Sequence, residues 1–292
     1  MAAGDSAPAG HSTPANHSAP AGDTIRSGTG IRVGDYHTHS RFSDGEGEPA
    51  ELVERAIALG LPAIGISDHY APEVLGEQGG YGVARDRLDD YVAAVRDAAR
   101  RYPEITVLLA LEADYVPEAE DELGAALAAY PFDYVIAGLH FVDRFSFDDL
   151  PGRDDPRWQD PGVYRRYYAL VRRAMQTGLF DVLAHIDYIR LWGHRLPGDI
   201  SAAEDDALAA VAEAGAALEV NTTGTLDFAG RMYPVPGLLA RARARGVPIV
   251  FGSDAHELGQ VGWMFDEAVA LARSAGYDAS RELPSRRERP FA

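Results

Sequence analysis

The sequence predicts an α/β fold in which a parallel sheet closes into a barrel. Seven short apolar stretches, rich in Val, Ile and Leu, alternate along the chain with seven stretches of helical periodicity. Strands that are buried on both faces of a parallel sheet have this composition, and seven or eight such units in series usually form a barrel. A doubly wound open sheet is the alternative, but no G-x-G-x-x-G follows any predicted strand.

The predicted strands and helices alternate strictly. The strands are expected at residues 31–36, 63–67, 106–111, 134–139, 182–184, 217–220 and 248–252. The helices are expected at residues 49–59, 87–102, 118–130, 163–177, 202–214, 235–245 and 266–275. In the first helix, Leu52, Ala56 and Ile57 recur at helical spacing, and Gly60 marks its end. Glycines also follow four later helices, at Gly178, Gly215, Gly246 and Gly276.

The composition excludes several kinds of chemistry. The chain has 292 residues, no Cys, no Lys and a net charge of −18. The missing Cys excludes thiolate metal sites and cysteine nucleophiles, and the missing Lys excludes a Schiff-base lysine and a P-loop. So acidic a chain is not expected to bind nucleic acid or a membrane surface. We therefore expect a small-molecule partner, while the oligomeric state stays open.

Both ends of the chain differ in composition from its middle. Residues 1–30 are rich in Ala, Pro, Ser, Gly and His and contain SAPAG twice, so we expect a disordered tail. Residues 31–282 form the predicted barrel domain, and the Arg-rich residues 283–292 are expected to form a loose C-terminal tail. No signal-peptide pattern and no apolar run of membrane-spanning length occur, so we expect a cytoplasmic protein.

Side chains that can bind metal ions lie at the end of every predicted strand. In chain order they are His37 and His39, Asp68 and His69, Glu112, His140, His185, Glu219 and Asn221, and Asp254 and His256. All carboxyl ends of the strands lie on one face of a parallel barrel, so these side chains should converge. His37 and His39 should also point to the same side, because side chains of an extended chain alternate.

The joint pattern favours a metal centre over unrelated polar residues. A single His at a strand end is more often a hydrogen-bonded core residue than a ligand, but six of the nine His follow predicted strands. Only His11, His17 and His194 lie elsewhere. Imidazole and carboxylate groups without thiolate suit Zn²⁺, Fe²⁺ or Mn²⁺. The ligands outnumber the needs of one ion, and metal clusters bridged by a carboxylate are typical of phosphoester hydrolysis.

Several motifs resemble those of the polymerase and histidinol phosphatase (PHP) superfamily. They are DYHTHSRFSDG at residues 35–45, GISDHYAP at 65–72, LEADYVPE at 111–118, FDYVIAGLHFVD at 132–143, FDVLAHIDYIRLWG at 180–193, LEVNTTG at 218–224 and GSDAH at 252–256. The chain looks most similar to monofunctional histidinol-phosphate phosphatases within this superfamily. It differs from their pattern at Gly138-Leu139, where many relatives have Ser-Val, and at Thr225-Leu226, where an Arg is common.

The resemblance implies a distorted (β/α)₇ barrel with three divalent transition-metal ions, Zn, Fe or Mn. One ion would be bound by His37, His39, Glu112 and Asp254. The second would be bound by Glu112, as a bridge, with His140 and His185, and the third by Asp44, His69 and His256.

The resemblance also implies hydrolysis of L-histidinol phosphate to L-histidinol and phosphate, a step of histidine biosynthesis. Arg190 and Arg231 are the candidates for binding the phosphate, and Asp254 or His256 for protonating the leaving group. Two alternatives stay open. The chain could be a PHP phosphoesterase that acts on nucleotides or other small phosphate esters, or a binding module that has lost catalysis.

Overall fold

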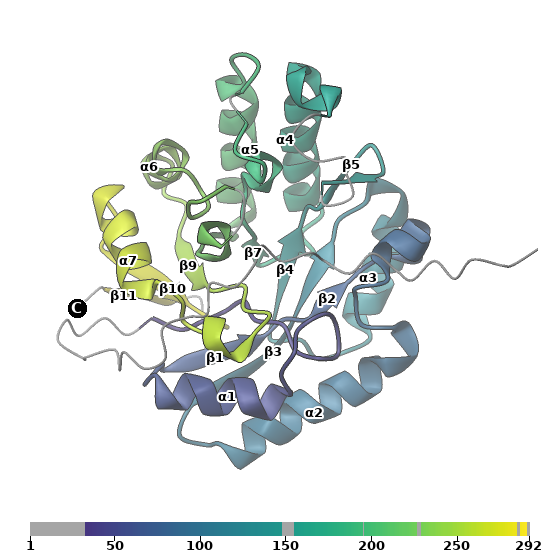
Figure 1. Ribbon diagram of the computed structural model, residues 1–292, viewed down its shortest axis with the longest axis vertical. Helices are drawn as coiled ribbons and strands as arrows, with labels where there is room; N and C mark the ends of the chain where they lie inside the picture. The colour runs from purple at the N-terminus through teal and green to yellow at the C-terminus, as the bar shows by residue number, and fades with distance from the viewer. Residues whose placement is uncertain (1–32, 148–154, 195, 227–228, 285–286, 291–292) are drawn as a thin grey trace, which may run out of the picture.

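A curled parallel sheet lies at the centre of the molecule, with helices around it (Figure 1). The computed structural model describes residues 33–147, 155–194, 196–226, 229–284 and 287–290, so the predicted N-terminal tail lies outside the described residues. In spatial order the main strands are β1 (Ala63–Ile66), β3 (Thr106–Asp114), β4 (Tyr134–Gly138), β7 (Val182–Leu183), β8 (Ala217–Asn221) and β9 (Ile249–Gly252). A short strand, β2 (His69–Tyr70), also pairs with β3. Every pair in this sheet is parallel, as predicted.

The segment around Asp35 to Thr38 joins the two edges of this sheet. Asp35 forms a parallel bridge with Ile64 of β1, and Thr38 forms one with Ala255 just beyond β9. This segment was predicted as a strand at residues 31–36, but it makes isolated bridges because successive residues pair with opposite edges. The Tyr36 N–H, for example, donates to the Phe251 carbonyl at 2.9 Å. The result is the distorted barrel that the sequence predicts.

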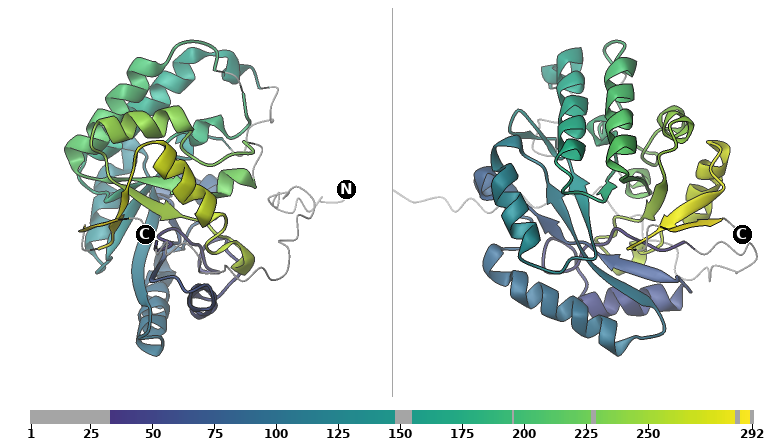
Figure 2. Two further views of the ribbon diagram at one scale, coloured as in Figure 1. Left: turned by 90° about the vertical axis from the view of Figure 1, so that its left-hand side faces the viewer. Right: turned by 180° about the vertical axis from the view of Figure 1, so that it is seen from behind.

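The described part of the chain contains seven α-helices, and each matches a predicted helix to within two residues at both ends. They are α1 (Pro49–Ala58), α2 (Leu88–Arg101), α3 (Glu120–Ala128), α4 (Pro161–Gln176), α5 (Ser201–Ala214), α6 (Pro236–Ala244) and α7 (Phe265–Ser274). Helices α4 and α5 stand side by side outside the sheet (Figure 2). Gly215 ends α5 with a φ of 65°, a conformation that glycine adopts without steric cost.

The inside of the barrel is filled with buried side chains. Tyr134 of β4 crosses this space, and its hydroxyl donates to the Tyr36 carbonyl at 2.5 Å. A Cβ on Gly65 of β1 would lie 1.7 Å from that hydroxyl oxygen, so the contact requires glycine there. The tyrosine thereby connects β4 to the segment that closes the barrel.

Two antiparallel strand pairs were not predicted from the sequence. One joins β5 (Phe141–Val142) to β6 (Phe145–Ser146), and the other joins β10 (Ala279–Glu282) to β11 (Arg287–Pro290). The second pair lies partly in the C-terminal segment that was expected to be a loose tail at residues 283–292. Residues 287–290 of this segment pair with β10 through main-chain hydrogen bonds, which do not depend on the Arg-rich side chains.

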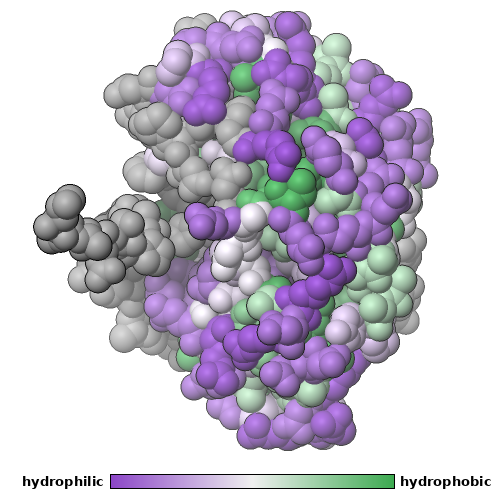
Figure 3. All heavy atoms as spheres, turned by 90° about the vertical axis from the view of Figure 1, so that its right-hand side faces the viewer, coloured by the Kyte–Doolittle hydropathy of each residue, from purple (hydrophilic) through white to green (hydrophobic). Residues whose placement is uncertain are grey.

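The surface is largely polar on the face that Figure 3 shows. The described residues of the face shown in Figure 3 are mostly hydrophilic, with small hydrophobic areas between them. No helix in the described residues is long and apolar enough to cross a membrane.

Candidate metal centre

Nine side chains that the sequence singled out as metal ligands come together at the carboxyl end of the barrel. His69 lies on β2 and Glu112 inside β3, whereas His140, His185, Asp254 and His256 follow β4, β7 and β9. His37, His39 and Asp44 come from the segment that closes the barrel and the turn after it. The side chain between the two histidines, Thr38, points the other way and donates to the Gly65 carbonyl. The alternation of an extended chain therefore directs His37 and His39 to one side, as predicted.

Glu112 lies at the centre of the cluster. Its Oε2 atom is 3.1 Å from His37 Nε2 and 2.8 Å from His69 Nδ1. Its Oε1 atom is 3.1 Å from His185 Nε2 and 3.5 Å from His140 Nε2. The two carboxylate oxygens thus face different groups of histidines, which is the arrangement of a carboxylate that bridges two metal ions.

A second group of ligand atoms lies nearer the surface. Asp44 Oδ1 is 3.3 Å from His256 Nε2 and 3.7 Å from His69 Nε2. The His39 ring lies against those of His69 and His256, at centroid distances of 4.1 and 4.3 Å. One ligand atom from each of these four residues lies within 4.8 Å of the others. Asp254 connects this group to the first, because its Oδ1 atom lies 3.0 Å from His39 Nε2 and 3.6 Å from His37 Nε2.

Several of these atoms are buried without a hydrogen-bond partner. They include His37 Nε2, His69 Nδ1, Glu112 Oε2 and Asp44 Oδ1, each of which faces a ligand atom of another residue. Unpaired buried polar atoms are rare in folded proteins and call for an explanation. Imidazole nitrogens and carboxylate oxygens that converge without hydrogen-bond geometry fit a cluster of transition-metal ions.

The electrostatics of the cluster also favour cations. Burial raises the pKa of Glu112, but His37, His69 and His140 outweigh burial and hold that pKa well below its usual range. Burial lowers the pKa of His69, but Glu112 and Asp44 outweigh it and raise that pKa to about 9. The pKa of His140 is also raised to about 9, because Asp114 and Glu112 outweigh burial. The carboxylates thus create a negative potential that holds positive charge, whether protons or metal ions.

His39 is the exception among these histidines. Burial lowers its pKa to about 3, and the neighbouring His69 and His256 act in the same direction. The imidazole is therefore neutral at physiological pH, which is the form that binds a metal ion.

The two arginines predicted to bind phosphate lie beside Asp187. Arg190 ends the short helix η6 (Tyr188–Arg190); its Nη2 pairs with Glu204 of α5, and its Nε is 3.8 Å from Asp187 Oδ2. Arg231 follows the Asn221–Gly224 loop and acts on Asp187 electrostatically. A guanidinium carries five N–H donors, so these contacts leave further donors on each arginine.

Two carboxylates beside the cluster contact its histidines, and sequence reasoning did not predict either contact. Asp114 lies two residues after Glu112 on β3, and its Oδ1 is 2.8 Å from His140 Nδ1. Glu219 of β8 lies 2.7 Å from His37 Nδ1. Glu219 was recognised as a strand-end residue but given no role. The strand period of two, which places Asp114 on the same face as Glu112, was the signal that would have identified Asp114.

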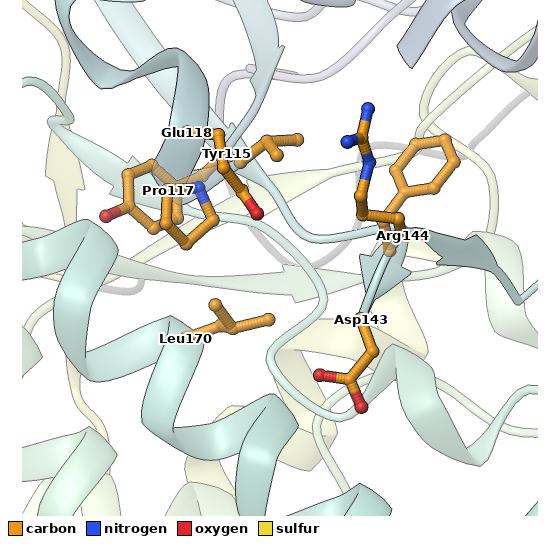
Figure 4. Close-up of a pocket in the computed structure, with 8 residues that line it drawn as sticks. Tyr115, Pro117, Glu118, Asp143, Arg144 and Leu170 are labelled. Carbon is orange, nitrogen blue, oxygen red and sulfur yellow. The ribbon is translucent and has the colours of Figure 1, made fainter. Parts of the chain in front are cut away.

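A separate surface pocket lies beside the β5–β6 hairpin (Figure 4). Two of its charged residues are engaged elsewhere, because Asp143 pairs with Arg166 at 2.7 Å and Arg144 donates to the Val74 carbonyl at 2.6 Å. None of the nine clustered side chains lines it. The cluster around Glu112 is therefore the candidate functional site.

Comparisons with known proteins agree with this assignment. The "Probable histidinol-phosphatase" of Deinococcus radiodurans is 34% identical over 245 residues, which cover 83% of this chain and 93% of that protein. The histidinol-phosphatase of Bacillus subtilis is 26% identical over 80% of this chain and 96% of its own. Among solved structures, the histidinol phosphate phosphatase of Lactococcus lactis, complexed with Zn, L-histidinol and phosphate, has the same fold. It aligns with a TM-score of 0.71 at 22% identity, over 88% of this chain and 99% of that one. The model of the PHP domain family matches residues 35–223, and the chain therefore belongs to the PHP family.

Proposed function

We propose that this protein is a metal-dependent phosphatase that hydrolyses L-histidinol phosphate to L-histidinol and phosphate. The observation that carries the proposal is the convergence of nine ligand-type side chains on Glu112, with buried atoms that lack hydrogen bonds. The choice of substrate is supported by the two relatives above, which are named histidinol-phosphatase and are matched over 93% and 96% of their lengths.

The cluster would hold three divalent transition-metal ions, Zn, Fe or Mn. His37, His39, Glu112 and Asp254 would bind the first, Glu112, His140 and His185 the second, and Asp44, His69 and His256 the third. The 2.8 Å distance from His69 Nδ1 to Glu112 Oε2 supports placing the sites of neighbouring ions close together. When bound, such ions supply an activated nucleophile and neutralise the charge of the phosphate oxygens.

The charge of the site then suits an anionic substrate, although the whole chain carries −18. Three divalent ions would contribute about six positive charges, against the five carboxylates of Asp44, Glu112, Asp114, Glu219 and Asp254. The local charge of the loaded site is therefore positive. The remaining guanidinium donors of Arg190 and Arg231 would bind phosphate oxygens at its edge.

The proton for the leaving oxygen would come from Asp254 or His256. Both lie on the loop after β9, and the His256 side chain has the largest exposed fraction of the cluster, 35%. Its Nδ1 atom is 2.9 Å from the Asp254 carbonyl oxygen, which orients the ring. His256 can therefore reach a substrate at the mouth of the site.

A panel of phosphate esters at equal concentration tests the proposal. With Zn²⁺ or Mn²⁺ present, we expect the highest kcat/KM for L-histidinol phosphate and a loss of all activity in His37→Ala. A large preference for a nucleotide would instead support a PHP phosphoesterase of different specificity. A fully metal-loaded protein that hydrolyses no ester would point to a binding module.

A further inference from the structure

The carboxylate of Glu219 lies behind the cluster and contacts proposed metal ligands without belonging to their set. Glu219 is on β8, and its side chain is 1% exposed. A buried carboxylate without a cation or several hydrogen bonds is strongly destabilising. The partners of the Glu219 carboxylate therefore indicate its function.

Glu219 accepts hydrogen bonds on both oxygens. Oε1 is 2.7 Å from His37 Nδ1. Oε2 accepts from the His185 main-chain N–H at 3.0 Å and from Asn221 Nδ2 at 3.0 Å. One side chain is thus connected to two of the proposed ligands, which approach Glu112 from different strands.

Asn221 extends this network to a third proposed ligand. Its Oδ1 accepts from the Thr223 main-chain N–H at 2.9 Å, and this contact fixes which end of the amide is oxygen. The Nδ2 group must then face the carboxylates, and its two protons suffice for Glu219 and for Asp254 Oδ2, which lies 3.2 Å away. Glu219, Asn221 and Asp254 are therefore held in one orientation.

We propose that Glu219 is a positioning residue of the metal centre, which sets the tautomer of His37 and, through Asn221, the orientation of Asp254. The inference rests on the proposed metal centre. A carboxylate at Nδ1 requires the proton on that nitrogen, so the lone pair of His37 lies on Nε2. Nε2 is the atom that points to Glu112 at 3.1 Å and has no hydrogen-bond partner. Histidine ligands are commonly oriented in this way by a carboxylate on the other ring nitrogen.

Glu219 and His37 are packed closely against the main chain of β9. A Cβ on Gly252 of β9 would lie 1.9 Å from Glu219 Oε1 and 2.6 Å from His37 Cβ. Glycine at this position therefore allows the carboxylate and the imidazole to meet. This close approach supports a specific contact between Glu219 and His37.

Glu219→Gln is informative because glutamine cannot reproduce both sets of contacts. If the amide oxygen faces His37 Nδ1, the NH₂ group opposes the donors of His185 and Asn221. If the amide is reversed, its NH₂ group faces Nδ1, which must then accept, and the proton moves to Nε2. Either arrangement disturbs the ligand atom of His37 without a large change in side-chain volume.

The test is a Zn²⁺ titration of the full chain, stripped of metal, in competition with a chromophoric chelator. We expect Glu219→Gln to weaken one binding step by about 10- to 100-fold, the usual effect of losing a residue that orients a ligand. Asn221→Ala should weaken it less, because it leaves the contact between Glu219 and His37 intact. If Glu219→Gln does not fold, the Zn²⁺ affinity of Asn221→Ala alone tests the inference.

Glu204→Gln is the matched control, because Glu204 is also a buried glutamate but pairs with Arg190 and Arg241. It should lower the thermal unfolding temperature and leave the affinity for Zn²⁺ unchanged. Wild-type affinity in both Glu219→Gln and Asn221→Ala would overturn the inference while leaving the proposed function intact. A wild-type chain that binds no Zn²⁺, Mn²⁺ or Fe²⁺ would overturn both.

Discussion

Glu112 illustrates how a single residue obtains its role from its surroundings. The strand pattern identifies it only as a carboxylate at a strand end, and its bridging role was implied by resemblance; the structure shows that both oxygens are surrounded by histidines. Asp254 is a second case. It has a φ of 55°, a left-handed conformation that Asp tolerates better than most residues, and its main-chain N–H donates to the His37 carbonyl at 2.8 Å. Such conformations persist where the surrounding structure enforces them, often at functional sites.

Arg190 gives a prediction at this scale. Arg190→Ala should lower kcat/KM for histidinol phosphate by roughly 10- to 100-fold, because a charge-assisted hydrogen bond contributes about 1.5–3 kcal/mol. The metal content should not change, since Arg is not a ligand. The unfolding temperature should also fall, because Glu204 and Asp187 lose a cation. Steady-state kinetics, elemental analysis and thermal unfolding on one sample measure all three effects.

Glu204→Gln separates the two roles of Arg190. It breaks the same ion pair from the other side and keeps the guanidinium, so it should lower stability with a much smaller effect on kcat/KM. If Arg190→Ala lost stability as Glu204→Gln does but kept wild-type kcat/KM, Arg190 would have only a structural role.

At the scale of elements, the ends of the strands place the ligands. Strand β3 continues to Asp114, past the predicted end at residue 111, and β2 pairs with it so that His69 lies opposite Glu112. None of the nine candidate ligands lies on an α-helix of the described residues. The site therefore depends on close packing between neighbouring strands.

Gly252→Ala tests this packing. The added Cβ would overlap Glu219 Oε1, so we expect a loss of stability of about 1–3 kcal/mol and weaker Zn²⁺ binding. Denaturant unfolding and the chelator titration measure these effects.

Gly237→Ala is the control, because no atom outside its own helix lies within 4 Å of the added Cβ on α6. It should be neutral or slightly stabilising, since Ala favours a helix over Gly by roughly 0.5–1 kcal/mol. If the two variants had the same stability and the same affinity for Zn²⁺, β8 and β9 would have to shift apart at little cost, and the close packing would not be important.

At the scale of the whole molecule, metal ions should contribute to folding stability. Elemental analysis of protein purified without chelator should find more than one transition-metal ion per chain. Removing the ions should abolish activity and lower the unfolding temperature, because ligands that bind only the folded state stabilise it, by about 2.7 kcal/mol at 100 times Kd. Added Zn²⁺ or Mn²⁺ should restore both properties. A reproducible content of one ion or fewer, with full activity, would contradict the trinuclear proposal.

The N-terminal segment gives the last prediction. Residues 1–30 have a composition that cannot bury enough apolar surface to fold alone. Removing the residues before Ile31 should therefore leave kcat/KM and the unfolding temperature unchanged. A large loss in either measurement would show that the segment contributes to the folded enzyme.

The sequence by itself determined the order of strands and helices, and its resemblance to the PHP superfamily gave the nine candidate ligands. The seven helices appear where the apolar spacing predicts them, and His37 and His39 share a side because an extended chain alternates. Only the tertiary structure decided the contacts between distant segments. His37 and Glu219 are 182 residues apart, and no local pattern specifies their 2.7 Å contact. The same holds for Arg190, whose pairing with Glu204 depends on how η6 packs against α5, and for the pairing of Arg287–Pro290 with β10, which no local pattern predicted.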